Sequence, residues 1–490
     1  MQVEKKINAD PILKNFIYQA SYQILSLILP LITAPYISRI LGAEGTGIYS
    51  YTNSILYFFT MMANLGISNY GNREISAAME DKEKLSRTFW EIYICHASTT
   101  LLIGVFYGIY LTSFNTFYHE IFLWQGIQLI AVFFDITWFF SGIQKFKITV
   151  RRNFIVRLFC VVAIFLFVKE KNDLWKYVLI LAASNLIGQL AVWFQIKQYI
   201  LPVKIKIKNI FSHFLPMFVL FIPIVAMSIY RYMDKVMIPL FSSVDELGLY
   251  ENSEKIISLS LSLISTIGVV LLPKMSSIVK KEDKNLIEYY IENSMKYSYI
   301  LAFGLTGGII GIAPIFAPVF FGEEFVKCGE LLSLLAITIL FITWSNSIRS
   351  QYLIPNKKDI GFIVSAFSGS ALNLVLNVFL IRHIGAKGAV IATILTELVV
   401  ALIHTLYSYK SINFIKILKS IYIFFFPAGL MLFFVRVVGA ILGEHVYTLV
   451  LQILTGALLY LISVGLILYI QRDALFLRIT EKIKKRIRKK

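Results

Sequence analysis

Charge and cysteine are both scarce in this chain. Of its 490 residues, 16% are charged and 57% are hydrophobic, whereas a soluble domain has about a quarter of its residues charged. This balance excludes a water-soluble globule with an ordinary surface and indicates an integral membrane protein. The three cysteines, Cys95, Cys160 and Cys328, are scattered through mostly apolar surroundings. Their spacing excludes a disulfide framework and a cysteine metal cluster.

Motifs for enzymatic chemistry are also missing. The chain has no GxxxxGK(S/T) phosphate-binding loop and no GxSxG nucleophile motif. No cluster of His, Cys, Asp and Glu has metal-ligand spacing, and the six histidines are dispersed: His96, His119, His213, His383, His404 and His445. These absences favour a transporter over an enzyme and predict no cofactor and no metal.

Long apolar runs are abundant instead. A bilayer span needs about 20 apolar residues, and lipid-exposed segments must be helices or closed barrels. The runs are too continuous for the alternating strands of a barrel. We therefore predict an all-α integral membrane protein with about fourteen transmembrane helices, at residues 14–38, 47–70, 87–111, 117–141, 152–168, 174–196, 210–239, 247–272, 288–320, 326–353, 360–382, 386–409, 415–438 and 446–470.

The positive charges alternate between the loops of this topology. The net charge is +18, and most Lys and Arg fall in every second loop and in the C-terminal tail. Because positive residues concentrate on the cytoplasmic side, both termini are predicted to be cytoplasmic. The basic tail is predicted to rest on the anionic inner leaflet, and the charge is not taken as a sign of nucleic-acid binding. Two of these inner segments contain Lys145–Arg152 and Arg349–Lys358.

A weak internal repeat divides the chain. Gly47-Ile48-Tyr49 recurs as Gly248-Leu249-Tyr250, six predicted spans later, and both copies follow a long proline-bearing span. This offset is typical of a transporter with two parallel six-helix halves. We therefore predict two pseudo-symmetric six-helix lobes around a central cavity, plus two further helices and a tail: residues 1–209, 210–410, 411–472 and 473–490.

Charged residues inside the spans are candidates for the cavity, because a charge at mid-membrane normally faces a partner or a polar site. The stretch Tyr230–Lys255 gathers Arg231, Asp234, Lys235 and Lys255 after a long apolar run. For Asp135 and Glu397, both an ion-coupling role and a structural ion pair remain open. Uncharged polar residues such as Asn53 suit sugar hydroxyls, and hydrogen bonds between helices explain them equally well. Glu91 and His96 are interpreted as part of a polar seam.

Several stretches resemble a known family. They are LILPLITAPYISRILGAEGTGIYSYTNSI from Leu27, GNREISAA from Gly71, FSGIQKFKITVRRNFIVRLFCVVAIFLFVK from Phe140 and YRYMDKVMIPLFSSVDELGLYENSEKI from Tyr230. Their order and spacing resemble bacterial Wzx-type flippases, the O-antigen and capsule repeat-unit transporters of the multidrug/oligosaccharidyl-lipid/polysaccharide superfamily. The resemblance covers nearly the whole chain.

The resemblance implies a function and a site. Such proteins move an undecaprenyl-diphosphate-linked oligosaccharide from the inner to the outer leaflet of the bacterial cytoplasmic membrane by alternating access. Membrane lipids and other polysaccharide assembly proteins are the partners it suggests. The implied cavity is cationic, and the matching positions are Arg39, Arg73, Asp234, Lys235 and Lys255, with Arg231 and Asn53 added from the residues themselves. Coupling to H⁺ or Na⁺ is left open, with Asp135, Asp234 and Glu397 as candidate ion sites.

Two alternatives remain. A related drug/cation antiporter would need an acidic cavity, which the Lys and Arg around residue 235 disfavour. A membrane-bound polysaccharide polymerase or ligase would need a sizeable outer loop for its catalytic residues, and the predicted outer loops are short.

Overall fold

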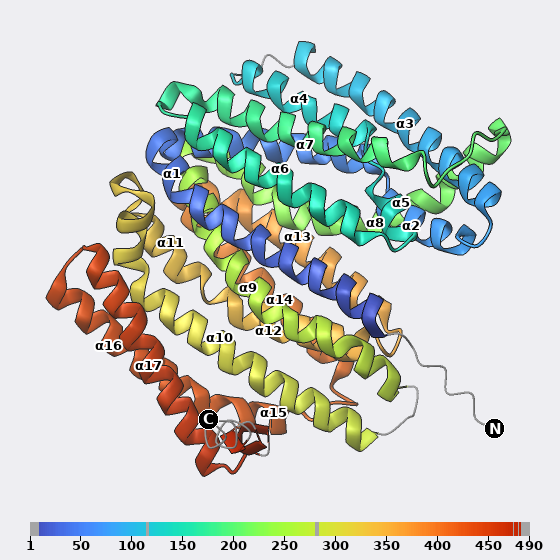
Figure 1. The fold of residues 1–490 in the computed structure, drawn as a ribbon. Helices are drawn as coiled ribbons and strands as arrows, with labels where there is room; N and C mark the ends of the chain where they lie inside the picture. The colour runs from blue at the N-terminus through green and yellow to red at the C-terminus, as the bar shows by residue number, and fades with distance from the viewer. Residues whose placement is uncertain (1–8, 114–116, 280–283, 474, 479, 482–490) are drawn as a thin grey trace, which may run out of the picture. The chain divides into compact units, whose positions relative to one another are not determined.

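Helices form all of the regular structure in the part of the chain that the computed structural model describes, which is residues 9–113, 117–279, 284–473, 475–478, 480 and 481. They divide into two compact units, unit 1 from Met1 to Gly248 and unit 2 from Leu249 to Lys490 (Figure 1). The predicted all-α class is confirmed. Most of the predicted basic tail, residues 482–490, and the first eight residues lie outside the described part.

Unit 1 contains eight α-helices, the start of a ninth and one short 3₁₀ turn. These are α1 (Ala9–Asn64), α2 (Ile67–Ala78), α3 (Lys82–Ser113), α4 (His119–Phe133), α5 (Thr137–Gly142), α6 (Phe146–Phe167), η1 (Lys171–Asp173), α7 (Leu174–Ile196), α8 (Ile207–Phe241) and the first turn of α9 (Val244–Val279).

Unit 2 contains the rest of α9 and the helices that follow it. These are α10 (Lys284–Phe321), η2 (Glu323–Phe325), α11 (Cys328–Leu335), α12 (Thr338–Ile348), the π-helical turn η3 (Arg349–Leu353), α13 (Asp359–Ile384), α14 (Ala386–Ser408), α15 (Phe414–Ile421), η4 (Tyr422–Phe424), α16 (Phe425–Leu442) and α17 (Val446–Ile470).

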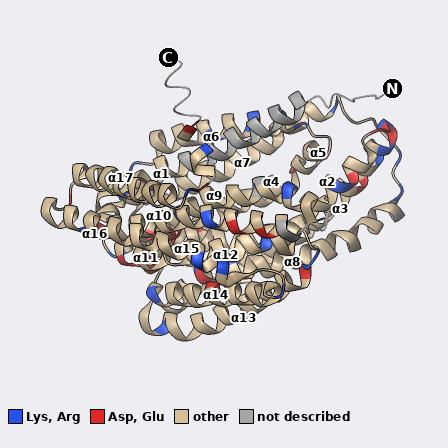
Figure 2. Cartoon of the chain, turned by 90° about the horizontal axis from the view of Figure 1, so that it is seen from below, with Lys and Arg blue, Asp and Glu red and all other residues tan. Residues whose placement is uncertain are grey.

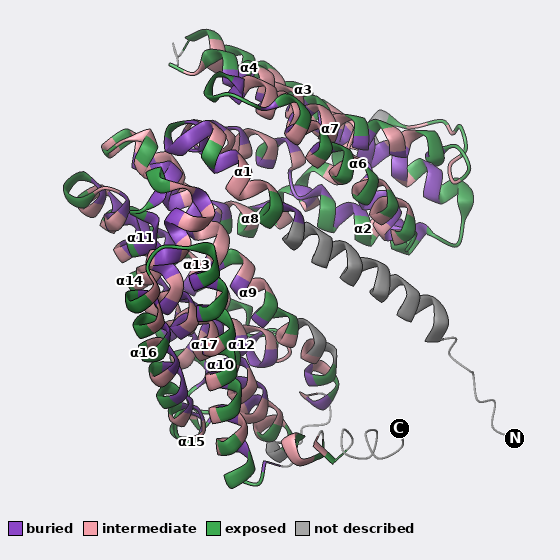
Figure 3. Ribbon diagram, turned by 60° about the vertical axis from the view of Figure 1, so that its left-hand side comes forward, coloured by how far each residue is buried: buried purple, intermediate pink, exposed green. Residues whose placement is uncertain are grey.

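The helices have the surface of a membrane protein. Each of the fourteen predicted apolar runs coincides with a helix or with consecutive helices, and nine segments among the described residues are long and apolar enough to cross a bilayer. Long stretches of ribbon carry no Lys, Arg, Asp or Glu (Figure 2). Large apolar side chains such as Phe159 and Ile470 are 69% and 76% exposed, and many exposed positions lie on the outward helix faces (Figure 3). Such a surface suits lipid rather than water.

The first two predicted spans are two helical segments of α1 that meet at a kink. The helix α1 is assigned from Ala9 to Asn64, but Gly42 has the non-helical angles φ 71° and ψ −175°, and it lies within the break that the sequence predicted between residues 39 and 46. Glycine has no Cβ, so it adopts this positive-φ backbone at little cost. The break is therefore confirmed, but it takes one non-helical residue rather than a loop.

The helix α8 packs within unit 1 against α1, α2 and α3. The division between compact units thus falls between Gly248 and Leu249, at the start of α9. The boundaries predicted at 209/210 and 410/411 mark the ends of the sequence repeat, not the limits of the compact units. They stay predictions. In unit 2, α16 and α17 pack on α10, where the Tyr460 hydroxyl donates to the Ile300 carbonyl at 2.5 Å.

A buried carboxylate fastens the end of α17 to α10. Asp473 is 8% exposed and pairs with Lys296, while the Tyr297 hydroxyl donates to its Oδ1 at 2.5 Å. The backbone N–H groups of Leu475 and Phe476 also donate to Oδ1, at 3.1 and 3.0 Å. Burial alone raises the pKa of Asp473, but the hydrogen bonds from Lys296, Tyr297 and Phe476 outweigh it and hold this pKa below its ordinary value.

Replacing Asp473 with Asn is expected to lower the stability of unit 2 by about 3 kcal/mol at neutral pH, because it leaves Lys296 buried without its partner. A carboxyl whose folded-state pKa is lowered stabilises the fold above the ordinary Asp pKa of about 3.9, and this contribution disappears as the pH falls through the folded-state value. Thermal unfolding of both proteins in detergent between pH 7 and pH 3 measures the difference. The gap between their stabilities should narrow toward the acid end, and a constant gap would contradict the assignment.

Candidate functional site

Two of the predicted cavity arginines lie far apart within unit 1. Arg39 is exposed on α1, just before the kink at Gly42. Arg73 is exposed on α2, where it pairs with Glu74 at 3.0 Å and lies over the Tyr70 ring at 5.4 Å. The straight part of α1 between the kink and Asn64 is about 33 Å long at ~1.5 Å per residue. The structure therefore does not bring Arg39 and Arg73 together.

One predicted residue, Lys235, lies in a polar and aromatic cluster where α1 meets α8. Tyr57 of α1 stacks on Tyr232 of α8 with ring centroids 3.8 Å apart, and its hydroxyl lies 3.1 Å from the Ser228 hydroxyl. Lys235 lies over the same Tyr232 ring at 5.6 Å. Asn53, half-buried, precedes Tyr57 by one helical turn and so shares its face. We call Asn53, Tyr57, Ser228, Tyr232 and Lys235 the α1–α8 seam.

The two neighbours of Lys235 in the predicted cluster have different surroundings. Asp234 is 4% exposed, whereas Arg231 is on an exposed face of α8. In unit 2, Lys255 is half-buried on α9 and pairs with Glu251 at 3.6 Å, one turn earlier. A Lys–Glu pair of this spacing partly neutralises the cation. The predicted stretch thus combines a buried acid, a lysine on an aromatic ring and a lysine already paired with an acid.

The candidate ion-coupling residues are held by local partners. Asp135 lies at the break between α4 and α5, where its Oδ1 accepts from the Thr137 N–H at 2.8 Å and from the Thr137 hydroxyl at 2.6 Å. Asp135 directly precedes Ile136, the N-cap residue of α5, and its bonds to the residue two positions on form an Asx-type turn. Glu397 is 7% exposed on α14 and lies close enough to Arg349 to interact with it electrostatically. Arg349 was counted with the inner-loop charges at the sequence level, but it lies at the start of η3.

A hydrogen-bonded cluster joins α2, α3 and α8. Glu91, 6% exposed, accepts from Asn209 Nδ2 at 2.8 Å, and its other oxygen lies 3.5 Å from His213 Nε2. The Tyr70 hydroxyl lies 2.6 Å from His213 Nδ1. The sequence predicted a polar seam at Glu91 without its partners, which come from helices distant in the chain. His96 is separate: it is fully buried, and neither of its ring nitrogens has a hydrogen-bond partner among the described residues.

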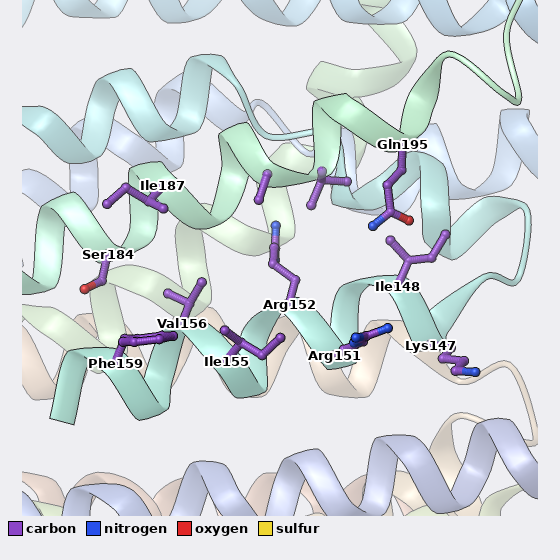
Figure 4. Close-up of a pocket in the computed structure, with 12 residues that line it drawn as sticks. Lys147, Ile148, Arg151, Arg152, Ile155, Val156, Phe159, Ser184, Ile187 and Gln195 are labelled. Carbon is purple, nitrogen blue, oxygen red and sulfur yellow. The ribbon is translucent and has the colours of Figure 1, made fainter. Parts of the chain in front are cut away.

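A groove of about 700 Å³ runs between α6 and α7 in unit 1. We call it the α6–α7 groove. Figure 4 shows Lys147, Arg151 and Gln195 toward one end, Arg152 between the helices, and Phe159 and Ile187 toward the other end. Its lining residues are Lys147, Ile148, Arg151, Arg152, Ile155, Val156, Phe159, Ser184, Ile187, Ala191, Val192 and Gln195. One end is therefore cationic, and the rest is mainly apolar.

The three cations of this groove have different surroundings. Arg152 crosses from α6 to α7, donating to Gln189 Oε1 at 2.9 Å and to the Gly188 carbonyl at 3.2 Å. It therefore holds the two helices together at the floor. Lys147 and Arg151 are exposed, one helical turn apart, and present their charge to the groove mouth. A phosphate group is the ligand that such a pair favours.

The α6–α7 groove was not predicted from the sequence, because Lys145–Arg152 were assigned to a cytoplasmic loop. In the structure α6 begins at Phe146, so Lys147, Arg151 and Arg152 belong to its first two turns. A helical wheel extended backwards to residue 146 aligns 148, 151, 152, 155, 156 and 159 on one face. That periodicity was the available signal.

Comparisons with known proteins agree on family and fold. Residues 12–279, more than half of the chain, match the family described as “Polysaccharide biosynthesis protein”. A protein of Shigella dysenteriae, described as “Putative O-antigen transporter”, is 23% identical over 383 residues, which are 76% of this chain and 94% of that protein.

Two solved structures share the fold. The structure “Lipid II flippase MurJ, inward closed conformation” has a TM-score of 0.72 and 16% identity, covering 94% of this chain and all of that one. An inward-facing multidrug resistance MATE family transporter of the MOP superfamily has a TM-score of 0.57 and 11% identity, covering 78% and 97%. At these identities the likeness concerns the fold, while the family match extends over most of unit 1 and into α9. This protein belongs to the polysaccharide biosynthesis protein family, as its sequence motifs predicted.

Proposed function

We propose that this protein is a flippase that moves a lipid-linked oligosaccharide across the bacterial cytoplasmic membrane for cell-surface polysaccharide synthesis. The substrate is an oligosaccharide unit on undecaprenyl diphosphate, taken from the cytoplasmic leaflet and released in the outer one. Both termini are cytoplasmic in this proposal, as the alternation of positive loops favours. Transport proceeds by alternating access, with the substrate path open to one side of the membrane at a time.

The α6–α7 groove is the observation that carries this proposal. A diphosphate-linked lipid has an anionic head and a long apolar tail. The groove offers Lys147 and Arg151 at one end and Ile155, Phe159 and Ile187 along its length. The cations lie in an inner segment of the predicted topology, at the depth of the cytoplasmic head groups. The groove therefore fits the first binding step of such a lipid in that leaflet.

The α1–α8 seam suits the sugar part of the substrate. Sugars bind to aromatic faces and to hydroxyl and amide groups, and the seam supplies Tyr57, Tyr232, Ser228 and Asn53. Lys235 adds a positive charge beside the same rings. Movement of the substrate is driven in this proposal by the membrane potential or by coupled H⁺ or Na⁺. Asp234, Asp135 and Glu397 are the candidate ion sites.

A drug/cation antiporter is the second candidate, favoured by the likeness to a MATE transporter fold. The charge of the α6–α7 groove disfavours it, because two exposed cations at the mouth repel cationic substrates. The protein is a transporter in both proposals, and neither requires a catalytic residue.

Reconstitution tests the two candidates directly. Full-length protein in liposomes that contain a fluorescent undecaprenyl-diphosphate oligosaccharide is expected to move the label between leaflets, measured by quenching or enzymatic trimming from outside. Protein-free liposomes give the background rate. Uptake of a cationic dye in the same liposomes without movement of the lipid would favour the antiporter instead.

A further inference from the structure

A second cavity, of about 190 Å³, is lined by residues of unit 2 alone. Its walls come from α9, α10, α12 and η3. Apolar residues of α9 form one wall, and the polar lining consists mainly of hydroxyl groups around one arginine: Ser298, Thr343, Asn346, Ser347, Arg349 and Ser350. At about 30 Å³ per water, it has room for roughly six water molecules. It is therefore large enough for a small ion with its ligands, but not for a lipid tail.

Two polar groups of this cavity lack partners. Arg349 Nε is fully buried and has no hydrogen-bond partner among the described residues, and the same is true of the Thr343 hydroxyl. Thr343 is 1% exposed. Leaving a buried polar group unsatisfied costs about 1–3 kcal/mol, and more for a charged one. Native proteins rarely retain such groups without a ligand, an ion or water to satisfy them.

The helix α12 ends at this cavity. Arg349 begins the π-helical turn η3, which ends at Leu353, directly follows α12 and is followed by a turn at residues 354–357. The wider turn at the helix end changes the direction of the side chains that follow Ile348, and Arg349 and Ser350 line the cavity.

The groups around Arg349 include an aromatic ring and an acid. Its guanidinium lies over the Phe362 ring at 5.4 Å, and the buried carboxylate of Glu397 on α14 is close enough to interact with its charge. His404, also on α14, hydrogen-bonds Ser365 at 2.8 Å and lies 3.1 Å from the Ser345 carbonyl oxygen. The Nε donor of Arg349 has no partner among the described residues.

We propose that this cavity is a binding site for a phosphate-type oxyanion. Guanidinium groups bind phosphate oxygens with strong charge-assisted hydrogen bonds. The Thr343 hydroxyl, which has no partner among the described residues, donates to one of the remaining oxygens, and the Ser350 hydroxyl turns from the Asn346 carbonyl to donate to another. Two sources carry this chemistry: free phosphate or diphosphate in solution, and the diphosphate of a lipid-linked substrate. The site itself does not depend on the flippase function.

Calorimetric titration of the purified full-length protein in detergent with inorganic pyrophosphate tests the site, with sodium chloride at matched ionic strength as the reference. Saturable binding is expected for the unaltered protein. Arg349→Gln is expected to weaken it at least tenfold and Thr343→Val about threefold. Arg382→Gln removes an exposed arginine of the same unit and is expected to leave binding unchanged. Thr343→Val and Ser350→Ala decide the question if Arg349→Gln does not fold.

Two results overturn the proposal. One is the absence of saturable pyrophosphate binding to the unaltered protein. The other is unchanged pyrophosphate binding in folded Arg349→Gln and Thr343→Val proteins. If Lys147→Gln and Arg151→Gln abolish that binding instead, the pyrophosphate binds in the α6–α7 groove and not in this cavity. Competition by undecaprenyl diphosphate in nanodiscs identifies the lipid as the source, and lack of competition identifies free phosphate or diphosphate. The flipping assay is measured separately, so each hypothesis can fail without the other.

Discussion

One methyl group added at Gly47 or at Gly248 is expected to destabilise unit 1 by about 3 kcal/mol, the upper end of the usual cost of over-packing. A Cβ at Gly47 would lie 1.9 Å from the carbonyl oxygen of Val244 and 2.8 Å from its side chain. A Cβ at Gly248 would lie 2.0 Å from the carbonyl oxygen of Ala43. Both clashes are with backbone, so no side-chain rotation relieves them. The helices α1 and α9 would have to separate.

The measurement is thermal unfolding of Gly47→Ala and Gly248→Ala in detergent, with Gly108→Ala as the matched control. Gly108 lies in the interior of α3, and a Cβ there would meet nothing within 4 Å. Alanine in a helix interior is more favourable than glycine by about 0.5–1 kcal/mol, so the control is expected to be slightly more stable. Equal effects at the three positions would show that α1 and the start of α9 do not cross as closely as the structure indicates.

For these two glycines the repeat was predictable from the sequence, but their contacts were not. The pattern Gly-Ile-Tyr and Gly-Leu-Tyr indicated an internal repeat, because a repeat can be recognised from the order of residues alone. The reciprocal contact, with Gly47 against Val244 and Gly248 against Ala43, depends on a crossing of segments about 200 residues apart. No local propensity encodes such a contact.

The helices were predictable from apolar length, because the bilayer imposes it. Each of the fourteen predicted runs coincides with a helix or with consecutive helices, and nine segments among the described residues are long and apolar enough to cross a bilayer. The break predicted within residues 39–46 contains the kink of α1 at Gly42. Its form was not predictable, because the sequence indicated a loop and the structure uses one non-helical glycine.

The candidate sites were only partly predictable for a similar reason. Charges inside apolar runs, such as Asp234 and Lys235, were visible as exceptions to their surroundings. Arg151 was hidden because it lies among other cations, and Arg349 because it was grouped with Lys357 and Lys358. A positive charge in such a place normally marks a cytoplasmic loop. Their significance comes from the helical start at Phe146 and the π-helical turn at Arg349, which composition does not reveal.

Removing the two exposed cations of the α6–α7 groove is expected to raise the substrate concentration needed for half-maximal flipping about tenfold. A hydrogen bond to a charged group contributes about 1.5–3 kcal/mol when buried, and solvent screening at this exposed mouth reduces it. A loss of about 1.4 kcal/mol corresponds to the tenfold change. The maximal rate should change less, because the groove acts in capture of the lipid rather than in its translocation.

The double variant Lys147→Gln/Arg151→Gln tests this with the flipping assay, and Lys197→Gln/Lys204→Gln is the control. The control removes the same charge from exposed positions that do not line the groove. Ala191→Trp is a second, independent test, because it fills the apolar part of the α6–α7 groove without changing the charge of the protein. Both groove variants should raise the half-saturating concentration, while the control should not.

The pattern across these variants separates specific capture from a general field effect. If the control lowers flipping as much as the groove variant, net positive charge near the membrane surface explains the result. If the double charge variant raises the half-saturating concentration but Ala191→Trp does not, the groove binds the phosphate head of the lipid but not its apolar tail. Only loss in both arms, with an unaffected control, supports a groove that holds head and tail of one lipid. Arg152 is left intact in all of them, because its bonds to Gly188 and Gln189 hold α6 to α7 and its loss would confuse binding with folding.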